Sequence, residues 1–452
     1  MKILIAGDGR VGSTLARQLS AEGHDLVLID SNGSVLENTE EKYDLMSVQG
    51  NCASMQTLLQ ADVEHAELLI ACTGTDEVNL LSCLTAHRLN PKIHTIARIR
   101  DPEYLEQAYK MRDAFGLSLT FNPERQAARE IERLLKSPGF LKRDYFAHGR
   151  VEIAELRVEE ESRLCNVPLT AISGIVKCRV LVCSVLRDGQ AIAPDGRFVI
   201  RAGDRLFVTA SSDNLAIMLK NLGVVTHKVR NVLLAGGGMV AYYLAQQLEN
   251  SSITVHILER DPERCRKLAA LVPHAQIVQG DVGDQSFLDS EGLANYDALV
   301  SLTGSDELNM IVSLYADSKE IPQIITRLGH VENNLIIDSL PLGSVICPRK
   351  LCCNNIVRYV RAMQNQSGAA LTIHSIADGH AEAMEFAVDE DTLHCGEPLR
   401  QIKLKPHILL VGISRGHEVE IPDGNSTFSR GDHVVIVSSG EDVILQLNDI
   451  FA

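Results

Sequence analysis

The sequence predicts an α/β protein that arose by tandem duplication. It is expected to hold two Rossmann-like parallel-sheet domains, each followed by a small α+β domain that we call the C-lobe. Three observations predict this class: a glycine motif that recurs at a fixed offset, alternation of short apolar runs with amphipathic helical patterns, and clusters of short strands separated by turns. A chain of 452 residues is long enough for three or four domains.

The duplication is visible in an ordered series of matches. The motif at residues 7–12 recurs at residues 236–241, an offset of 229 (236 minus 7), and Asp30 matches Glu259 at the same offset (259 minus 30). Further pairs follow in the same order, within one residue of that offset: Thr73–Asn79 with Thr303–Asn309, Ile96–Arg98 with Ile325–Arg327, and Asp195-Gly196 with Asp423-Gly424. We therefore expect two equivalent halves, near residues 1–225 and 230–452.

The first part of each half carries the pattern of a parallel sheet. An apolar run precedes Gly7, and Val11, Leu15 and Leu19 then recur at the spacing of one helix face; the second half repeats the pattern from Val240. A strand, a glycine turn, an amphipathic helix and another strand form the βαβ unit, which requires parallel strands.

The second part of each half has a different texture. Residues 180–186, 198–200 and 205–209 are expected to form short strands, separated by turns at residues 187–189 and 194–196. This predicts a small α+β domain of roughly 75 residues.

The domain boundaries follow from these residue patterns. The segment from Pro123 to Leu135 is expected to form an amphipathic connecting helix, ended by Ser137-Pro138-Gly139. The predicted segments are a first Rossmann domain at 1–122, a connecting helix or crossover at 123–148, a first C-lobe at 149–226, a second Rossmann domain at 230–348, a connecting helix at 349–368 and a second C-lobe at 369–452.

The first glycine motif predicts a nucleotide site. Gly7 would make the tight turn, Gly9 would let backbone N–H groups approach a pyrophosphate, and Gly12 would allow close packing of helix on strand. The helix N-terminus adds unpaired donors and a positive dipole end. Asp30 ends the next strand, where a carboxylate accepts the ribose hydroxyls and repels a 2′-phosphate, so NAD or an adenine nucleotide is favoured over NADP. The alternative is a glycine turn kept only for packing.

The second motif predicts a similar site with two changes. Gly236 and Gly238 keep their places, whereas Ala241 stands for the third glycine and Glu259 for the aspartate. Alanine is a common variant at that position. An empty or purely structural site remains the alternative here.

Other residues at the carboxyl ends of the strands are candidates for ligand contact, since ligands of open α/β sheets bind there. Each has an ordinary structural reading as well: a solvated arginine, a turn, a helix N-terminus with acidic residues in its first turn, or a surface ion pair. These candidates are Asp8, Arg10 and Val11 in the first loop, Gly237, Met239 and Val240 in the second, Asn51 and Asp281 after the third strands, Thr73, Gly74, Asp76 and Thr303 after the fourth strands, and Arg98, Arg100 and Arg327 at the fifth.

Composition excludes several functions. A net charge of −16 disfavours binding to nucleic-acid phosphates and to anionic lipid, and the chain has no tryptophan and only 4% aromatic residues for base stacking. The acidic balance fits a protein partner with basic loops, although solubility accounts for it equally well. The eleven cysteines show no C-x-x-C pair, so we expect reduced, buried thiols and no metal site. Neither a signal peptide nor a membrane-spanning segment is expected.

The combined pattern resembles a known family. Two G-x-G-x-x-G domains, each with T-G-x-D-E-x-N after the fourth strand and a small domain with a P-D-G and G-D strand pair, resemble tandem RCK (regulator of potassium conductance) proteins of the TrkA-N plus TrkA-C type. The resemblance covers essentially the whole chain. Ala241 and Met239 depart from the usual family pattern.

The resemblance implies a regulatory subunit without catalytic residues. It implies a peripheral cytoplasmic protein that forms a homotetrameric ring beneath a membrane potassium translocator of the TrkH or TrkG type and binds NAD(H), in some members ATP or ADP, in its Rossmann domains. The positions matching the family's ligand residues are Gly7, Gly9, Gly12, Asp30, Thr73 and Arg98, with Gly236, Gly238, Glu259, Thr303 and Arg327 in the second half.

Two other functions remain open. An NAD-dependent dehydrogenase would need an acid or base near the nicotinamide, yet His94, His148, His256 and His417 are isolated in the sequence. A regulator of a channel or an antiporter would use the same fold, because fold does not fix function.

Overall fold

The structure is a computed structural model of the chain, in which contact density separates two compact units. Unit 1 comprises residues 1–127 and 348–360, and unit 2 comprises residues 128–347 and 361–452. The structure describes residues 1–40, 42–43, 45–136, 139–147, 150–224, 228–329, 337, 340–363, 370–377, 380–416, 418–440, 444 and 446–452.

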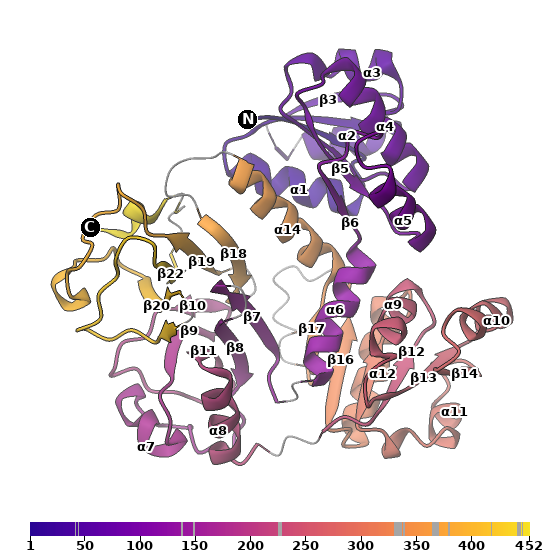
Figure 1. Cartoon of the computed structure of the whole chain (residues 1–452). Coiled ribbons are helices and arrows are strands. Elements are labelled where there is room, and N and C mark those ends of the chain that lie inside the picture. Colours follow the sequence, from indigo (N-terminus) through magenta and orange to yellow (C-terminus); the bar gives the residue numbers. More distant parts are fainter. Residues whose placement is uncertain are drawn as a thin grey trace. The chain divides into compact units, whose positions relative to one another are not determined.

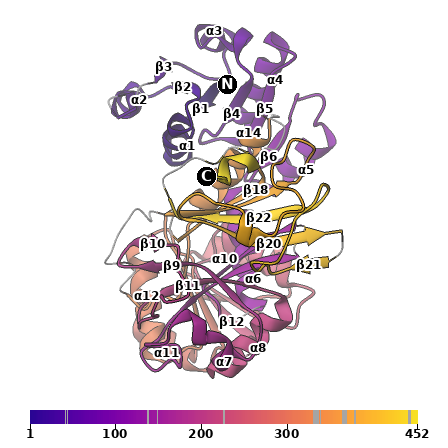
Figure 2. The ribbon, with the colours of Figure 1, turned by 90° about the vertical axis from the view of Figure 1, so that its left-hand side faces the viewer.

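Unit 1 contains the first Rossmann domain. Its sheet, drawn in indigo and violet in Figure 1 and labelled strand by strand in Figure 2, has six parallel strands in the order β3-β2-β1-β4-β5-β6, so the strand order reverses beside β1. Ligands of such sheets bind at that switch point. The elements are β1 (Lys2–Ala6), α1 (Arg10–Ala21), β2 (Asp25–Asp30), α2 (Gly33–Glu40), β3 (Met46–Gln49), α3 (Met55–Gln60), β4 (Leu68–Ala71), α4 (Asp76–Leu89), β5 (His94–Arg98), α5 (Pro102–Lys110) and β6 (Leu119–Phe121).

Unit 2 contains the second Rossmann domain, with the same topology. Its strands are parallel in the order β14-β13-β12-β15-β16-β17, which repeats the first sheet strand for strand. The elements are β12 (Asn231–Ala235), α9 (Met239–Leu248), β13 (Thr254–Glu259), α10 (Pro262–Leu271), β14 (Gln276–Gln279), α11 (Gln285–Ser290), β15 (Ala298–Ser301), α12 (Asp306–Ser318), β16 (Gln323–Arg327) and β17 (Ser344–Ile346). The two sheets confirm the predicted Rossmann domains.

The two connecting helices are exchanged between the units. Helix α6 (Pro123–Lys136) follows β6 of unit 1, but its residues from Ala128 onward belong to unit 2, where Gln323 Nε2 of β16 donates to Leu134 O at 2.8 Å (Figure 1). Helix α14 (Pro348–Met363) follows β17 of unit 2 and lies beside α1 in unit 1, where Gln18 Nε2 donates to Asn354 Oδ1 at 3.3 Å. Each Rossmann fold is therefore completed by a helix from the other half.

The C-lobes are two five-stranded antiparallel sheets in unit 2, in the orders β10-β9-β11-β8-β7 and β18-β19-β22-β20-β21. The first contains β7 (Lys142–Phe146), β8 (Val151–Arg157), α7 (Ile172–Val176), β9 (Leu181–Arg187), β10 (Gln190–Ile192), β11 (Arg205–Ala210) and α8 (Ser212–Leu222). The second contains β18 (Ala370–Ile376), β19 (Ala381–Ala387), β20 (Ile408–Arg415), β21 (Glu418–Glu420) and β22 (His433–Ser438). The predicted α+β C-lobes are confirmed.

The C-lobes share one apolar core. Ile153 and Phe207 of the first sheet and Ala383 and Val435 of the second are each at most 1% exposed and belong to a single cluster. Figure 2 shows the two C-lobe sheets side by side. Burying a large aliphatic or aromatic side chain contributes about 1.5–3 kcal/mol. The shared core therefore holds the two C-lobes together as one body.

Three features differ from the sequence prediction or fall outside the described residues. Residues 198–200 do not form a strand: only Val199 makes an isolated bridge, to Pro168, because this segment pairs with an irregular turn rather than a neighbouring strand. The first C-lobe sheet begins at Lys142, before the predicted start at 149, because β7 pairs antiparallel with β8. Lying outside the described residues are Ser137, Pro138, His148, His417 and the predicted boundaries at 148–149, 226 and 368–369.

No helix among the described residues combines the length and hydropathy needed to span a lipid bilayer.

Candidate functional site

The first glycine loop is shaped by two glycines that the fold itself requires. Gly7 has φ +99°, and a Cβ there would lie 2.9 Å from the backbone N and Cα of Thr73. A Cβ on Gly12 would lie 1.9 Å from the carbonyl oxygen of Gly7. Gly236 of the second half likewise has a positive φ, +116°, and a Cβ there would lie 3.0 Å from the backbone N of Thr303. These contacts bring each glycine loop against the turn after the fourth strand.

A second set of glycines has no such requirement. Gly9 and Gly238 begin helices α1 and α9 with φ of −74° and −77°, which any residue adopts, and a Cβ on either would meet no atom within 4 Å. Gly74 and Gly304, which follow the contact residues Thr73 and Thr303, are equally open. Neither packing nor conformation within the chain explains glycine at these four positions. They leave the backbone accessible at the edge where each loop meets each turn.

The acidic residues at the ends of the second strands are fixed by backbone donors. Asp30 accepts from the N–H of Asp8 at 2.8 Å and from that of Asn32 at 2.9 Å, one on each carboxylate oxygen. Glu259 accepts in the same way from Gly237 at 2.9 Å and from Asp261 at 2.9 Å. Each oxygen keeps a further lone pair, so both carboxylates can accept hydroxyl donors from a sugar.

Asn79 and Asn309 are site residues that the sequence did not reveal. Asn79 is fully buried, and its Oδ1 accepts from Thr73 N at 2.8 Å and from Thr73 Oγ1 at 2.7 Å, while its Nδ2 donates to Arg98 O at 2.9 Å. Asn309 makes the equivalent bonds in the second half. The side chain ties the turn after the fourth strand to the end of the fifth. The sequence feature that could have revealed this asparagine is the repeated T-G-x-D-E-x-N motif, which it ends in both halves.

The arginines and Asp76 at the ends of the strands hold one another and the backbone. Arg98 Nη2 lies 3.5 Å from Glu124 Oε1, and its buried Nε has no acceptor among the described residues. Asp76 Oδ2 accepts from Arg100 N at 2.8 Å, and the Arg100 guanidinium donates to the carbonyl of Gly74. In the second half Arg327 Nη1 donates to Thr303 O at 2.7 Å. Ligand contacts from these residues remain predictions.

The other candidate side chains occupy local structure. Asn51 Oδ1 accepts from Ala53 N at 3.0 Å and Asp281 Oδ1 from Gly283 N at 2.9 Å, both within turns after the third strands. Arg10 is exposed. Three more candidates lie in the first turns of α1 and α9: Val11 and Val240 are buried, and Met239 is 39% exposed.

Asp8 distinguishes the first loop from the second. Its side chain is 2% exposed, its Oδ2 accepts from Thr39 Oγ1 of α2 at 2.6 Å, and its Oδ1 is buried without a partner among the described residues. Burial raises the pKa of the carboxyl to about 6, the Thr39 hydrogen bond opposes this rise, and the charge of Asp30 adds to it. Gly237 holds the equivalent position, 229 residues further on.

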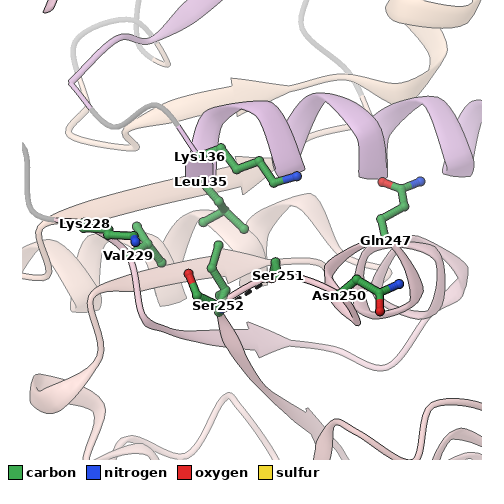
Figure 3. Close-up of a pocket in the computed structure, with 9 residues that line it drawn as sticks. Leu135, Lys136, Lys228, Val229, Gln247, Asn250, Ser251 and Ser252 are labelled. Carbon is green, nitrogen blue, oxygen red and sulfur yellow. Dashed lines mark hydrogen bonds between the residues drawn. The ribbon is translucent and has the colours of Figure 1, made fainter.

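A separate cavity of about 340 Å³ lies in unit 2. Figure 3 shows Leu135 and Lys136 of α6 facing Ser251 and Ser252, which follow the C-terminal end of α9. Because the glycine loop lies at the N-terminal end of α9, the cavity is at the opposite edge of the sheet from the strand ends that bind ligands in this fold.

Two of the histidines considered for catalysis, His94 and His256, do not lie at the carboxyl ends of the strands. His94 begins β5, and His256 Nδ1 lies 2.8 Å from the hydroxyl of Tyr296 within the second Rossmann domain. Burial lowers the pKa of His256. Neither adds an acid or a base to the glycine-loop edge.

Two doubly wound parallel sheets with glycine loops and acidic strand ends place the chain among tandem Rossmann-fold proteins of the nucleotide-binding type. The sequence matches the TrkA-N domain over residues 3–118 and 232–348, and the TrkA-C domain over residues 153–223 and 383–451. The chain therefore belongs to the TrkA family of Trk system potassium uptake proteins.

Individual relatives agree over nearly the full length. The Trk system potassium uptake protein TrkA of Haemophilus influenzae is 29% identical, over 100% of this chain and 98% of the relative. TrkA homolog 1 of Methanosarcina mazei is 30% identical over 97% of both chains.

Solved structures share the fold. The GsuK RCK domain superposes with a TM-score of 0.61 at 17% identity, over 97% of this chain and 92% of that one. The GsuK channel bound to NAD gives a TM-score of 0.59 at 17% identity, over 97% of this chain and 77% of that one.

Proposed function

We propose that this chain is the nucleotide-sensing regulatory subunit of a Trk-type potassium-uptake system. In this proposal it is a cytoplasmic protein held at the inner face of the membrane by a potassium translocator of the TrkH or TrkG type. Four chains form a ring, and NAD(H), with ATP or ADP as competing ligands, changes the shape of the ring and so the flow of ions. The chain itself catalyses no reaction.

The open glycines carry the proposal. Gly9 and Gly238 leave backbone N–H groups uncovered at the starts of α1 and α9, beside the fixed carboxylates of Asp30 and Glu259. A helix N-terminus offers donors and a positive dipole end to a pyrophosphate, and the carboxylate accepts the ribose hydroxyls. The arrangement fits an adenine dinucleotide in each half.

The relatives support the assignment to potassium uptake. Full-length matches are named as Trk system potassium uptake proteins, and the GsuK channel, which shares the fold, has been solved bound to NAD. The same likeness to a channel makes a channel regulator the second candidate function. Flux measurements with a Trk-type translocator separate the two.

The likeness to potassium-uptake proteins and to a channel's RCK domain favours regulation over hydride transfer. Several polar side chains at the glycine-loop edges hold the backbone: Asn79 accepts from Thr73 N, Asp76 accepts from Arg100 N, and Arg327 donates to Thr303 O. A dehydrogenase needs an acid or base positioned at the reacting carbon. An absorbance assay for NADH oxidation with 2-oxo acids should therefore show no turnover.

Regulation requires a difference in affinity. A nucleotide shifts the ring only if it binds one shape more tightly than another, and coupling energies of about 1–3 kcal/mol change an equilibrium by roughly 5- to 150-fold. NADH affinity should therefore differ between the free chain and its complex with the translocator. Equal affinities would exclude coupling.

The test is titration of the full chain with NADH, ATP and ADP by calorimetry. Gly9→Ala and Gly238→Ala place a methyl in the open space and should each weaken one site at least about tenfold. Gly174→Ala in the first C-lobe is the matched control, because Gly174 is equally open and needs no positive φ. Absence of heat with all three nucleotides would refute the proposed function.

A further inference from the structure

The two halves of the chain differ at one buried point beside the proposed nucleotide sites. In the first half Asp8 and Thr39 form a buried hydrogen bond of 2.6 Å between the glycine loop and α2. The equivalent residues of the second half, both 229 positions further on, are Gly237 and Leu268. A Cβ on Gly237 would lie 2.6 Å from Leu268 Cδ1, so the second half fills with a leucine the space that Asp8 occupies in the first.

The duplicate shows that the fold does not need the polar pair. A buried carboxylate costs free energy unless it is fully paired. Asp8 is incompletely paired, since its Oδ1 is buried and has no partner among the described residues. The second half has the same glycine loop, the same strand order and the same carboxylate at the end of its second strand, Glu259, without such a pair.

The charges around the two strand-end carboxylates, Asp30 and Glu259, also differ. The backbone N–H of Asp8 donates to the carboxylate of Asp30, so these two acidic residues are neighbours. Among the described residues, no lysine or arginine forms an ion pair with either of them. In the second half Arg264 Nη1 lies 3.5 Å from Glu259 Oε2. The residue equivalent to Arg264 in the first half is Val35. The carboxylate of the second half therefore has an arginine partner at a position where the first half has an apolar residue.

We propose that Asp8 makes the first nucleotide site proton-linked, so that a nucleotide binds there together with one proton taken from solvent onto the Asp8 carboxylate, whereas the second site binds its nucleotide without a proton. The inference rests on the proposed function, because it concerns the same site. The bond formed is the O–H bond of Asp8, and the buffer supplies the proton.

The geometry accommodates the proton. A protonated Asp8 can donate through Oδ2 to Thr39 Oγ1, which in turn lies 3.4 Å from the carbonyl of Val35 and can donate to it. The titratable groups around Asp8 are Asp30 of β2 and Cys72 after β4, and burial raises the pKa of Cys72 to about 12, so that this thiol stays neutral. Helix α2 also carries Glu37, which is exposed, and Arg10 in the loop is exposed.

The electrostatics give the direction of the coupling. The carboxyl of Asp8 already titrates near neutrality, with its pKa raised to about 6 by burial and by Asp30. A nucleotide diphosphate adds negative charge beside it, which raises the pKa further and draws a proton from solvent. First-site affinity should therefore be higher at pH 6 and fall as the pH rises to 8, while second-site affinity should stay constant.

The experiment isolates each site in the full chain. Gly238→Ala leaves the first site, Gly9→Ala leaves the second, and NADH is titrated by calorimetry in phosphate and in Tris, whose ionisation enthalpies differ. With one linked carboxyl we expect uptake of roughly half a proton or more at pH 7 at the first site, and an affinity loss of about tenfold from pH 6 to pH 8. At the second site uptake should be close to zero.

Two variants assign the proton to Asp8. Asp8→Asn, and the double variant Asp8→Gly with Thr39→Leu, which copies the second half into the first, should each abolish the uptake and the pH dependence. Glu37→Gln is the matched control: it removes an exposed acid from α2 and should leave both unchanged. A merely structural Asp8–Thr39 bond would alter stability but not proton uptake.

The outcomes are distinct. NADH binding at the first site without proton uptake, or with uptake that survives Asp8→Asn, would overturn the inference and leave the proposed function standing. No NADH binding to either site at any pH would instead refute the proposed function, and the inference with it.

Discussion

Asp144 of the first C-lobe and His374 of the second occupy equivalent positions of the two halves, 230 residues apart (374 minus 144), and bind each other: Asp144 Oδ1 lies 2.9 Å from His374 Nδ1. The other oxygen of Asp144 lies 2.9 Å from Lys142 Nζ. If the two halves were identical, both of these positions would carry the same residue, and two like side chains would face each other. Because both C-lobes belong to one chain, the two equivalent positions can carry different, complementary residues.

The first prediction concerns this pair. Burial opposes ionisation of Asp144, but Lys142 and His374 outweigh it and hold its pKa well below the usual range. Asp144→Asn removes the buried negative charge that faces both Lys142 and His374, so we expect a loss of about 3–5 kcal/mol in unfolding free energy. Urea unfolding at pH 7 measures the loss.

The pH dependence of that loss has a definite sign. A carboxyl with a lowered pKa contributes stability that is present above its unfolded pKa and is lost as the pH falls below it. The difference between wild type and Asp144→Asn should therefore persist from pH 7 to pH 5 and shrink below about pH 4. Glu106→Gln breaks the exposed ion pair with Lys110 and should cost less than about 1 kcal/mol. A similar cost for both variants would contradict the prediction.

The second prediction separates a positioning role from a structural one in helix α4. Asn79→Ala removes the side chain that ties Thr73 to Arg98, and leaves buried partners unpaired at a cost of about 1–3 kcal/mol. Because the Thr73 turn borders the first glycine loop, first-site NADH affinity should also fall several-fold.

Asn90→Ala at the other end of α4 is the control. Its Nδ2 donates to Val63 O at 3.0 Å and to Ala66 O at 2.9 Å, away from the glycine loop. This variant should lose comparable stability with unchanged NADH affinity. Unchanged affinity in both variants would show that Asn79 has only a structural role.

The third prediction contrasts two glycines of one motif. Gly12→Ala places a methyl 1.9 Å from the carbonyl oxygen of Gly7, so the loop or the helix must move, and we expect a thermal midpoint lower by several degrees. Gly9→Ala meets no atom, and should change stability by less than about 1 kcal/mol while weakening nucleotide binding. Differential scanning calorimetry and NADH titration measure the two effects. Equal destabilisation by the two variants would contradict the proposed division of roles.

The fourth prediction tests the Asp8 carboxyl in the absence of nucleotide. A pKa raised from 3.8 to about 6 means that the ionised form destabilises the folded state by up to about 3 kcal/mol (1.36 kcal/mol per pH unit) once the pH exceeds 6. Asp8→Asn should therefore gain stability relative to wild type as the pH rises from 4 to 7, and the gain should level off above pH 7. Chemical unfolding at four pH values measures it, and a constant difference would exclude a buried, titrating Asp8.

Much of the fold was predictable because its signals are local. The glycine loops, the acidic strand ends and the connecting helix from Pro123 each show as a short pattern of residue types with the period of a strand or a helix. Repetition at one offset then extended each assignment to the other half. The strand expected at residues 198–200 was wrong because β-branched and aromatic composition does not reveal whether a neighbouring strand is available.

The candidate site was predictable in part. Gly9 and Asp30 were recognised from the spacing of the motif, but spacing could not show that Gly9 stands in open space whereas Gly12 is pressed against Gly7. Asn79 went unnoticed because its role depends on Arg98, in a strand 19 positions further on.

The sequence by itself determined that the chain is duplicated, that each half opens with a nucleotide-type loop and that each closes with a small β-rich lobe. Only the tertiary structure decided that α6 and α14 change partners, that Asp144 meets His374, and that Asp8 is buried against Thr39 while Gly237 is covered by Leu268. These features depend on which distant segments exclude water from a side chain. Periodicity records only which face of an element is buried, so it cannot name the residue that buries it.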